Sequence, residues 1–593
     1  MPKPEKRGSG DWQTAGIDAF TGGINSSQRP ELIPETDLIQ CQNIILKQSR
    51  ALVDTGYHTF GNVVRGTPQT DFQYYQRSGV SELVLVTTAT FYKYATGATQ
   101  WQYISDGVKT TLTAQANAGA TTLTVASITG FANGQFVGVM LDNGTQHQTT
   151  VNGAPSGFTI TITNAIPAGR NAPIGAALVK AVDLTGTLDF LVSIILVPSN
   201  DWAVFTNGID TPRYYDGTES KILPNLPGGF NTCRVVANYN STLFMCNTVE
   251  GGLDLPQRIR RSDIGDPTNW STGLAGYDDL FNSSDFIRAA ETMGPYLIIY
   301  RERSIIRGQY VNTAGKIYDW ETTIDGEGAV SGQSVVNLNE QHLVFCNAGL
   351  FLFNGGYNLD SFGDKIFYNV FSETGDLNTD FRDRIFAFYV EELDEAWFFY
   401  PDTTSETCNV LIRYNVGDDN WTKRKFPDTF VGFGFYQTIS AKRWIDVVGP
   451  WSAQTFRWDS RTVSSSSPTT HFMSVGLNQV VEYDYATDKD NGTAISVILE
   501  TKDFFNKDWA MRHDSLQFYA RGTNITVEYS TDAGLNFQFF GTVTSANLSI
   551  ITLSKQFVCD KIRYRFTCSS SNFELDWLNL SYYEESRTMY RGG

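Results

Sequence analysis

The chain repeats one local pattern, in which an apolar strand is followed by a turn and by an aromatic strand ending in a Gly or Asp loop. Alternation of this kind indicates β-strands, and Gly and Asp are typical of the turns between them. The clearest pairs are 82–88 with 90–94, 202–207 with 212–217, 342–347 with 349–356, 395–400 with 410–415, and 444–449 with 454–459. They recur roughly every 40–60 residues once insertions are removed, a spacing typical of β-propeller blades.

We therefore predict an all-β protein built around a β-propeller of about six or seven blades, formed by residues 71–107 together with 181–485. A blade cannot cover both of its faces alone. Radial stacking covers each face with a neighbouring blade and leaves only short edges. A series of β-sandwiches would produce similar alternation and is the alternative fold.

A segment at 108–180 interrupts the repeat. Between 110 and 179 the only charged residues are Asp142 and Arg170, while Ala, Thr and Gly dominate. Residues 121–127 and 158–163 alternate strictly, and Asp-Asn-Gly at 142–144 is typical of a tight hairpin turn. We expect a small β-domain inserted into the first blade.

The two ends of the chain differ from the middle. Residues 1–70 contain few periodic segments and are predicted to form an extended N-terminal arm with the first strands. Residues 486–585 contain alternating strands and are predicted to form a jelly-roll-like β-sandwich; 586–593 would be a tail. The strands expected in the sandwich are 494–501, 515–520, 524–529, 561–566 and 573–582.

Bulk charge and the cysteines restrict the classes of function. The net charge is −18, with an isoelectric point near 4.8, which argues against tight nucleic-acid binding but not against a smooth channel for DNA. The charge also has the plainer role of keeping a protein in solution. The seven cysteines include no Cys-x-x-Cys pair, so we expect reduced, mostly buried thiols.

The sequence contains no segment that predicts membrane insertion. The first ten residues carry charge without an apolar stretch behind them, which is unlike a signal peptide. The longest apolar run, 188–197, contains Asp189 and is too short to span a bilayer. We expect a soluble protein with no membrane segment.

Searches for catalytic and metal-binding motifs give no candidate. The chain has no phosphate-binding Gly-x-x-x-x-Gly-Lys loop, no His-Glu-x-x-His and no Gly-x-Ser-x-Gly, and only five histidines. The stretch 488–492 resembles a calcium loop, but Thr487 stands where the first carboxylate should be. We predict no catalytic, cofactor-binding or metal-binding residues, no cofactor, and no enzyme activity.

One motif does match an enzyme class. Residues 530–537, Ser-Thr-Asp-Ala-Gly-Leu-Asn-Phe, fit the Asp-box of sialidases, which are propellers. The Asp-box is a turn device, in which the Asp side chain accepts amide bonds and the Gly allows a positive φ. It occurs once and outside the predicted blades, and no spacing picks out the acid and nucleophile of a glycosidase. We interpret it as structural.

Arg258, Arg260 and Arg261 form the densest basic cluster in the middle of the chain. Arg258 and Arg260 share one face of a predicted strand and could contact phosphate or a partner's carboxylate. The alternative is a solvated face, or ion pairs within the chain to Asp263 and Asp266. The basic triplet at 423–425 has the same two interpretations.

Several landmarks, in order, resemble one family, the tail nozzle or DNA-stabilisation proteins of short-tailed bacteriophages, similar to tail tubular protein B. They are Gly-Gly-Ile-Asn at 22–25 with Pro-Glu-Leu-Ile-Pro at 30–34, Arg-Tyr-Tyr-Asp-Gly at 213–217, the Ser-Asp-Ile-Gly-Asp-Pro-Thr-Asn-Trp turn at 262–270, and 527–534. The inserted segment resembles an accessory β-module of phage tail proteins.

The resemblance implies a structural virion protein at the distal end of the tail, assembled in the host cytoplasm. It would form a homo-hexameric ring below the tail adaptor (head-to-tail connector) protein and line the DNA exit channel. It would help to retain the packaged genome and attach tail fibres or spikes, with double-stranded DNA passing through non-specifically. The channel and partner contacts remain unassigned in the sequence. The alternatives are a receptor-binding or glycan-cleaving, sialidase-like tail component, and a tail-tip or baseplate protein of a long-tailed phage.

Overall fold

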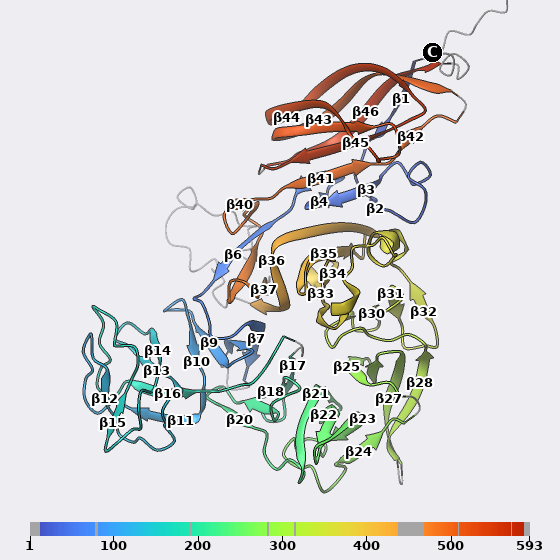
Figure 1. Ribbon diagram of the computed structural model, residues 1–593. Coiled ribbons are helices and arrows are strands. Elements are labelled where there is room, and N and C mark those ends of the chain that lie inside the picture. Colours follow the sequence, from blue (N-terminus) through green and yellow to red (C-terminus); the bar gives the residue numbers. More distant parts are fainter. Residues whose placement is uncertain are drawn as a thin grey trace, which may run out of the picture.

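The computed structural model describes residues 12–76, 81–188, 192–281, 284–313, 316–436, 468–507, 509–570 and 572–585. In these residues the chain is all-β, as predicted, with a propeller, a small inserted β-domain and a C-terminal β-sandwich (Figure 1). Within those ranges, helix is confined to α1 (Phe367–Val370) and the 3-10 turns Asp364–Ile366, Thr379–Arg384 and Glu391–Leu393.

Six blades of the propeller follow one another along the chain, each a meander of four antiparallel strands. The first three consist of β7 (Pro68–Tyr75), β8 (Ser81–Thr87), β9 (Phe91–Ala95) and β10 (Gln100–Tyr103); β17 (Ser193–Val197), β18 (Trp202–Thr206), β19 (Arg213–Tyr215) and β20 (Ser220–Ile222); and β21 (Phe230–Tyr239), β22 (Thr242–Glu250), β23 (Leu253–Arg261) and β24 (Gly276–Asp279). The next three consist of β25 (Ile287–Met293), β26 (Tyr296–Arg301), β27 (Ser304–Thr313) and β28 (Lys316–Asp325); β29 (Val335–Asn337), β30 (His342–Phe345), β31 (Leu350–Phe353) and β32 (Leu359–Ser361); and β33 (Phe386–Val390), β34 (Glu395–Tyr400), β35 (Cys408–Asn415) and β36 (Asn420–Tyr436).

A seventh blade closes the ring with strands from both ends of the propeller sequence. The first half of β36 pairs with β35, and after a register shift its second half pairs with β37 (Thr469–Ser474). Next come β38 (Gln479–Asp484) and, antiparallel to it, β6 (Gly56–Phe60) from the N-terminal region. Hydrogen bonding to β6 therefore joins the last blade to the start of the chain. The predicted strands 444–449 and 454–459 lie outside the described residues.

Apolar layers between the blades hold the ring together. Between the sixth and seventh blades, Phe399, Phe430 and Phe472 are completely buried, with ring centroids 5.1–6.2 Å apart. At the junction of the seventh and first blades, Thr70 Oγ1 of β7 donates a hydrogen bond to the carbonyl of Phe433, at 2.8 Å. Burial of apolar surface on both faces of each sheet is the main stabilising contribution in this architecture.

The inserted domain contains β11 (Ser105–Thr111), β12 (Thr122–Thr124), β13 (Phe136–Met140), β14 (Gln146–Thr150), β15 (Thr159–Thr161) and β16 (Ala177–Ala181), around its own apolar core. It follows the complete first blade and precedes the second, so the expectation that it interrupts the first blade is wrong. The reason is that β10 and β11 are separated by Ile104 alone, and no turn signal marks where the blade ends.

The C-terminal sandwich is a sheet that folds over on itself. It contains β39 (Lys489–Asp490), β40 (Thr493–Ala494), β41 (Val497–Thr501), β42 (Phe504–Phe505), β43 (Ala510–Ser530), β44 (Gln538–Cys559), β45 (Lys561–Cys568) and β46 (Glu574–Glu585). The long strands β43 and β44 form a hairpin. The first half of β43 pairs with β46 and its second half with β45, so one hairpin serves both layers.

The N-terminal segment lies between the sandwich and the propeller (Figure 1). It contains β1 (Trp12–Ile17), β2 (Gly23–Ile24), β3 (Asp37–Gln42), β4 (Ile44–Lys47) and β5 (Arg50–Val53). β1 and β5 pair with β46, β3 pairs with β41, and β2 runs parallel to β36. It is therefore more integrated than an arm on the surface, because its strands complete sheets whose other strands come from the far end of the chain.

Candidate functional site

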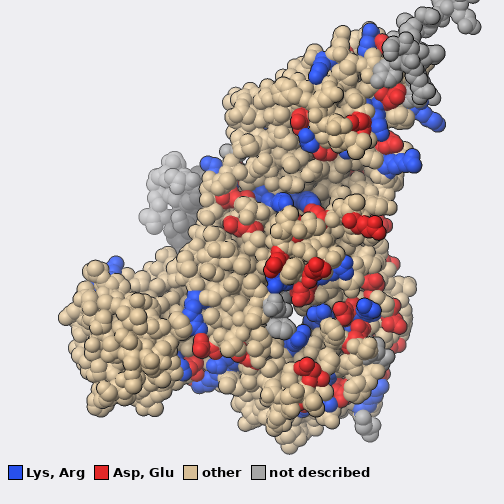
Figure 2. Space-filling view, in the orientation of Figure 1, with Lys and Arg blue, Asp and Glu red and all other residues tan. Residues whose placement is uncertain are grey.

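The first strands of the blades converge on a cavity of about 220 Å³ at the propeller axis. Figure 2 shows the molecule hollowed at this position. Every blade contributes to the wall, through Thr70 of β7, Ser193 of β17, Arg234 of β21, Glu291 of β25, Val335 of β29, Ala387 of β33 and Phe433 of β36. Convergence of many elements on one concave space is typical of binding sites, so this cavity is the candidate site.

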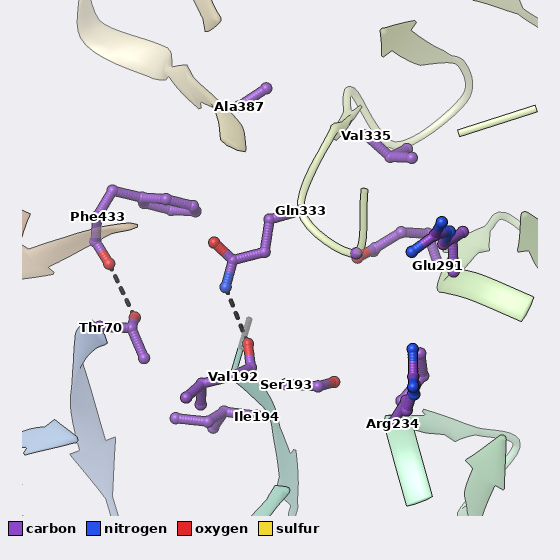
Figure 3. Close-up of a pocket in the computed structure, with 13 residues that line it drawn as sticks. Thr70, Val192, Ser193, Ile194, Arg234, Glu291, Gln333, Val335, Ala387 and Phe433 are labelled. Atoms are coloured by element: carbon purple, nitrogen blue, oxygen red, sulfur yellow. Dashed lines mark hydrogen bonds between the residues drawn. The ribbon is translucent and has the colours of Figure 1, made fainter. Parts of the chain in front are cut away.

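The neutral polar groups of the wall mostly hold the blades to one another. Gln333 Nε2 donates a hydrogen bond to the carbonyl of Val192, at 2.8 Å, as Figure 3 shows. Ser193 Oγ exchanges hydrogen bonds with the backbone of Val236. Ser193 is therefore engaged in blade packing, and no histidine or carboxylate of the described residues is bonded to it as a nucleophile would require. The Oε1 of Gln333 is buried and has no hydrogen-bond partner in the described part of the chain.

Three ionisable groups line the same cavity. Burial raises the pKa of Glu291 to about 7, although Asn337 Nδ2, at 3.4 Å, opposes that rise. Burial lowers the pKa of Arg234, and the charge of Arg288 lowers it further. Arg288 lies 3.6 Å from the carboxylate of Glu302, and its guanidinium stacks over Phe286. Two guanidinium groups thus share the cavity with a carboxyl that is largely protonated below neutral pH.

The basic cluster predicted from sequence is engaged in ion pairs within the third blade. Arg258 forms a bidentate pair with Asp279 at 2.7 Å, and Arg260 binds Glu250. Arg261 reaches Asp278 at 2.6 Å. The intrachain interpretation holds, but the predicted partners Asp263 and Asp266 are wrong. The pairing acids lie on β22 and β24, because strand register places them opposite the arginines.

The two acids expected to pair shape the following turn instead. Asp263 Oδ1 accepts hydrogen bonds from the backbone amides of Ile264 and Leu274, and Asp266 Oδ1 accepts from Thr268. The turn ends on Trp270, which is 3% exposed in a core cluster between the second and third blades. This segment is structural.

The triplet at 423–425 is likewise bound within the chain. Lys423 pairs with Asp376, and Lys425 pairs with Asp402 at 2.6 Å. Arg424 is fully buried and reaches Asp490 at 2.6 Å. The sequence did not reveal these acids as partners, since each lies more than twenty residues away.

The Asp-box forms the turn between β43 and β44, outside the blades, as predicted. Asp532 Oδ1 accepts a hydrogen bond from the Asn536 amide at 2.9 Å, and its pKa is lowered to about 2 by bonds from Ser530 and Asn536. Gly534 adopts a φ of +86°, and a Cβ there would lie 2.5 Å from the guanidinium of Arg563. The motif is therefore a turn, as interpreted.

The cysteines and possible metal ligands add no further site. All seven cysteines are free and buried, as expected from their spacing. Within the described ranges, no three His, Cys, Asp or Glu side chains are grouped as a metal site would require. In the same ranges, no helix has the length and apolar character needed to cross a membrane.

Comparison with known proteins gives no family. No protein-family model and no curated protein matches the chain. Among solved structures, a computationally designed protein, Ika8, is 9% identical over 72% of this chain and 100% of its own, with a TM-score of 0.34. Dihydro-heme d1 dehydrogenase NirN is 8% identical over 72% of this chain and 74% of its own, with a TM-score of 0.29. An exo-beta-1,3-galactanase from Phanerochaete chrysosporium is 8% identical over 60% of this chain and 95% of its own, with a TM-score of 0.22. No function is inferred from similarities this low.

Proposed function

We propose that this chain is a structural virion protein, one subunit of the distal nozzle ring of a short-tailed phage. The observation that carries the proposal is the outer edge of β44. This strand has 22 residues with one charged side chain, Lys555, and its only strand partner in the described residues is β43. Long edges of low charge promote association, and monomeric proteins normally protect them. A neighbouring subunit in a ring would cover this edge.

Hydrogen bonding between distant parts of the chain also suits a mechanically stiff subunit. β1 pairs with β46 and β6 pairs with β38, so the N-terminal segment is hydrogen-bonded to both the sandwich and the propeller. Pulling one part away from another would require these ladders to break. A collar that retains a packaged genome needs such stiffness.

The residues that carry the family resemblance lie at structural junctions. Gly23 has a φ of +70° and approaches the backbone of Trp421 so closely that a Cβ would lie 2.3 Å from its carbonyl oxygen. Asn25 donates a hydrogen bond to the buried carboxylate of Asp37 at 2.6 Å. Gly23 thus brings the N-terminal segment against β36 of the propeller, while the Asn25–Asp37 bond holds the segment's own fold. Both roles support an architectural meaning for the landmarks.

The proposed mechanism is steric and electrostatic. Loops that project into the ring axis narrow the bore, and a net charge of −18 per chain limits adhesion of DNA during ejection. The tail adaptor would bind one side of the ring, and tail fibres or spikes would bind its outer surface. No catalytic residue and no cofactor takes part in this mechanism.

Negative-stain imaging of the purified full-length chain, with and without the tail adaptor protein, tests the assembly. We expect six-fold rings. Ile550→Glu on the exposed face of β44 should reduce ring formation, while Phe158→Glu on the inserted domain should not; the two side chains are 64% and 66% exposed. Persistent monomers of the unmodified chain with the adaptor would overturn the proposal.

Duplex binding tests the smooth-channel part separately. We expect weak binding that disappears as salt is raised, because an acidic surface repels phosphate and retains only a few cationic contacts. A fluorescence-anisotropy titration with duplex DNA measures this. Nanomolar affinity at physiological salt would contradict it.

A second candidate function, glycan binding, is favoured by one open cavity beside the third and fourth blades. Tyr277, Tyr318 and Trp320 line it together with Asp278 and Asp279, and Tyr277 is 50% exposed. Aromatic rings beside carboxylates suit a sugar, although Arg258 covers one face of Tyr277 at 4.0 Å. Glycan-array binding that Tyr277→Ala abolishes, or release of reducing sugar, would favour this function over the nozzle.

A further inference from the structure

One layer of the C-terminal sandwich is open at both of its sides. Its four strands are β1, β46, β43 and the second half of β44, residues 549–559, in the order that Figure 1 shows. Within the described part of the chain, β1 pairs with β46 alone and β44 pairs with β43 alone. The layer therefore ends in two edges whose outward backbone N–H and C=O groups have no strand to bind.

The register of the layer is continuous from one edge to the other. Ile17 of β1 lies opposite Leu578 of β46. Leu578 also lies opposite Phe518 of β43, which lies opposite Ile551 of β44. Ile17, Leu578 and Phe518 are buried, whereas Ile551 at the edge is only half-buried. The apolar face is thus incomplete at β44, and a strand added there would extend it.

Neither edge carries the charges or prolines that normally prevent strand addition. β1 (Trp12–Ile17) has no charged residue and no proline. In β44 the one charged side chain, Lys555, folds back over its own hairpin. Its Nζ donates to the Phe539 carbonyl at 3.2 Å and lies 4.7 Å from the centre of the Tyr529 ring. Both edges are therefore suited to pairing with another strand.

The directions of the two edge strands favour a second copy of this chain as the partner. Successive strands of the layer are antiparallel, so β1 and β44 run in opposite directions. Copies related by rotation in a ring share one polarity, so β1 of one copy would meet β44 of the next as an antiparallel pair. Pairing of β44 with β44 would instead give a two-fold dimer, which leaves β1 open and cannot form a ring.

We propose that β1 of one subunit adds to β44 of its neighbour, so that one antiparallel β-sheet continues around the ring. This inference rests on the proposed nozzle assembly and names the strands that join its subunits. Each subunit supplies four strands, and closure of the ring leaves no edge of this layer exposed. Ala15 and Leu553, which are half-buried on the apolar face at the two edges, come together in the joined sheet.

Amide hydrogen exchange of the unmodified full-length chain tests the pairing. Exchange is compared between chains assembled into rings with the tail adaptor protein and chains kept monomeric by dilution without it. In the rings, amides of β1 and of residues 549–559 should exchange about fivefold more slowly or slower still, the effect of one net backbone hydrogen bond. β24, an outer strand of the third blade that the pairing does not involve, is the control and should be unchanged.

Photocrosslinking identifies the partner strand. Trp12→p-benzoylphenylalanine places the probe on β1, at a side chain that is 51% exposed. Within one chain β1 and β44 are two strands apart, about 14 Å by the usual strand spacing, so the probe does not reach its own β44. In rings of mixed isotope-labelled and unlabelled chains, we expect links between chains from position 12 to residues 549–559. Trp509→p-benzoylphenylalanine, at a side chain 42% exposed on the same sandwich, is the matched control and should give no such link.

Three results would overturn the pairing while rings are still seen by negative-stain imaging. They are β1 amides that exchange as fast in rings as in monomers, slower exchange in β44 alone, and links from position 12 to another part of the neighbour. Each of these leaves the nozzle proposal standing. Absence of rings would instead overturn the nozzle, and the pairing with it.

Discussion

Asp54 and Arg413 are 359 residues apart in sequence and form a buried ion pair, with Arg413 Nη1 donating to Asp54 Oδ1 at 2.9 Å. Asp54 follows β5 in the N-terminal segment, while Arg413 belongs to β35 of the sixth blade. Tyr483 of the seventh blade donates to the same carboxylate at 2.9 Å. Burial alone would raise the pKa of Asp54, but the charges of Arg413 and Arg424 hold it below its ordinary value.

Asp54→Asn should lower the stability of the junction between the N-terminal segment and the propeller by about 3 kcal/mol or more. The substitution removes the negative charge that compensates the buried guanidinium groups of Arg413 and Arg424. A buried charge that has lost its partner lowers the free energy of unfolding strongly. Urea unfolding and amide hydrogen exchange of β6 measure the effect. Asp418→Asn, at an exposed position, is the control. An unchanged midpoint for Asp54→Asn would contradict the role of this network.

Gly23→Ala should loosen the contact between β2 and β36. Alanine at a φ of +70° costs about 1 kcal/mol, and its Cβ would also collide with the Trp421 backbone, which cannot move aside as a side chain can. Thermal unfolding should show a lower midpoint. Gly97→Ala, which has open space around it, should have little effect, and equal midpoints for the two variants would contradict the structure here.

His342 should make the propeller less stable in mild acid. Its Nδ1 accepts from the Tyr300 hydroxyl and its Nε2 donates to the Thr292 carbonyl, so the buried ring is neutral. Burial lowers its pKa from 6.5 to about 4. The pKa of His342 is lower in the folded state than in the unfolded state, so its neutral ring contributes fully to stability above about pH 6.5. This contribution, up to about 3 kcal/mol, is lost as the pH falls from 6.5 toward 4.

Denaturant unfolding at several pH values checks this dependence. The decrease in the free energy of unfolding below pH 6.5 should be smaller in His342→Gln, because glutamine keeps a neutral polar group but cannot take up the proton. If the variant and the unmodified chain lose stability equally between about pH 6 and about pH 4, the assignment to His342 is wrong.

Much of the architecture could be predicted because its causes are local. Alternation of side-chain character with a period of two identified β8, β18 and β34 as blade strands. In a β-strand every second side chain points to the same face of the sheet, so this pattern can be recognised from the residues of the strand alone. The Asp-box turn followed from Asp532 and Gly534 alone, because a turn is closed by residues within a few positions of one another. The reduced, buried thiols followed from the spacing of the cysteines, which form no Cys-x-x-Cys pair.

Local patterns in the chain therefore predict the all-β class, the interrupted propeller and the character of individual turns. The three-dimensional fold was needed to show how β6 closes the seventh blade, which acids neutralise Arg258 and Arg413, and that Arg234, Arg288 and Glu291 line one cavity. These relationships arise because strand register and ring closure bring together residues far apart in the chain. Their pairing depends on the packing of whole sheets, and no local pattern of residues records it.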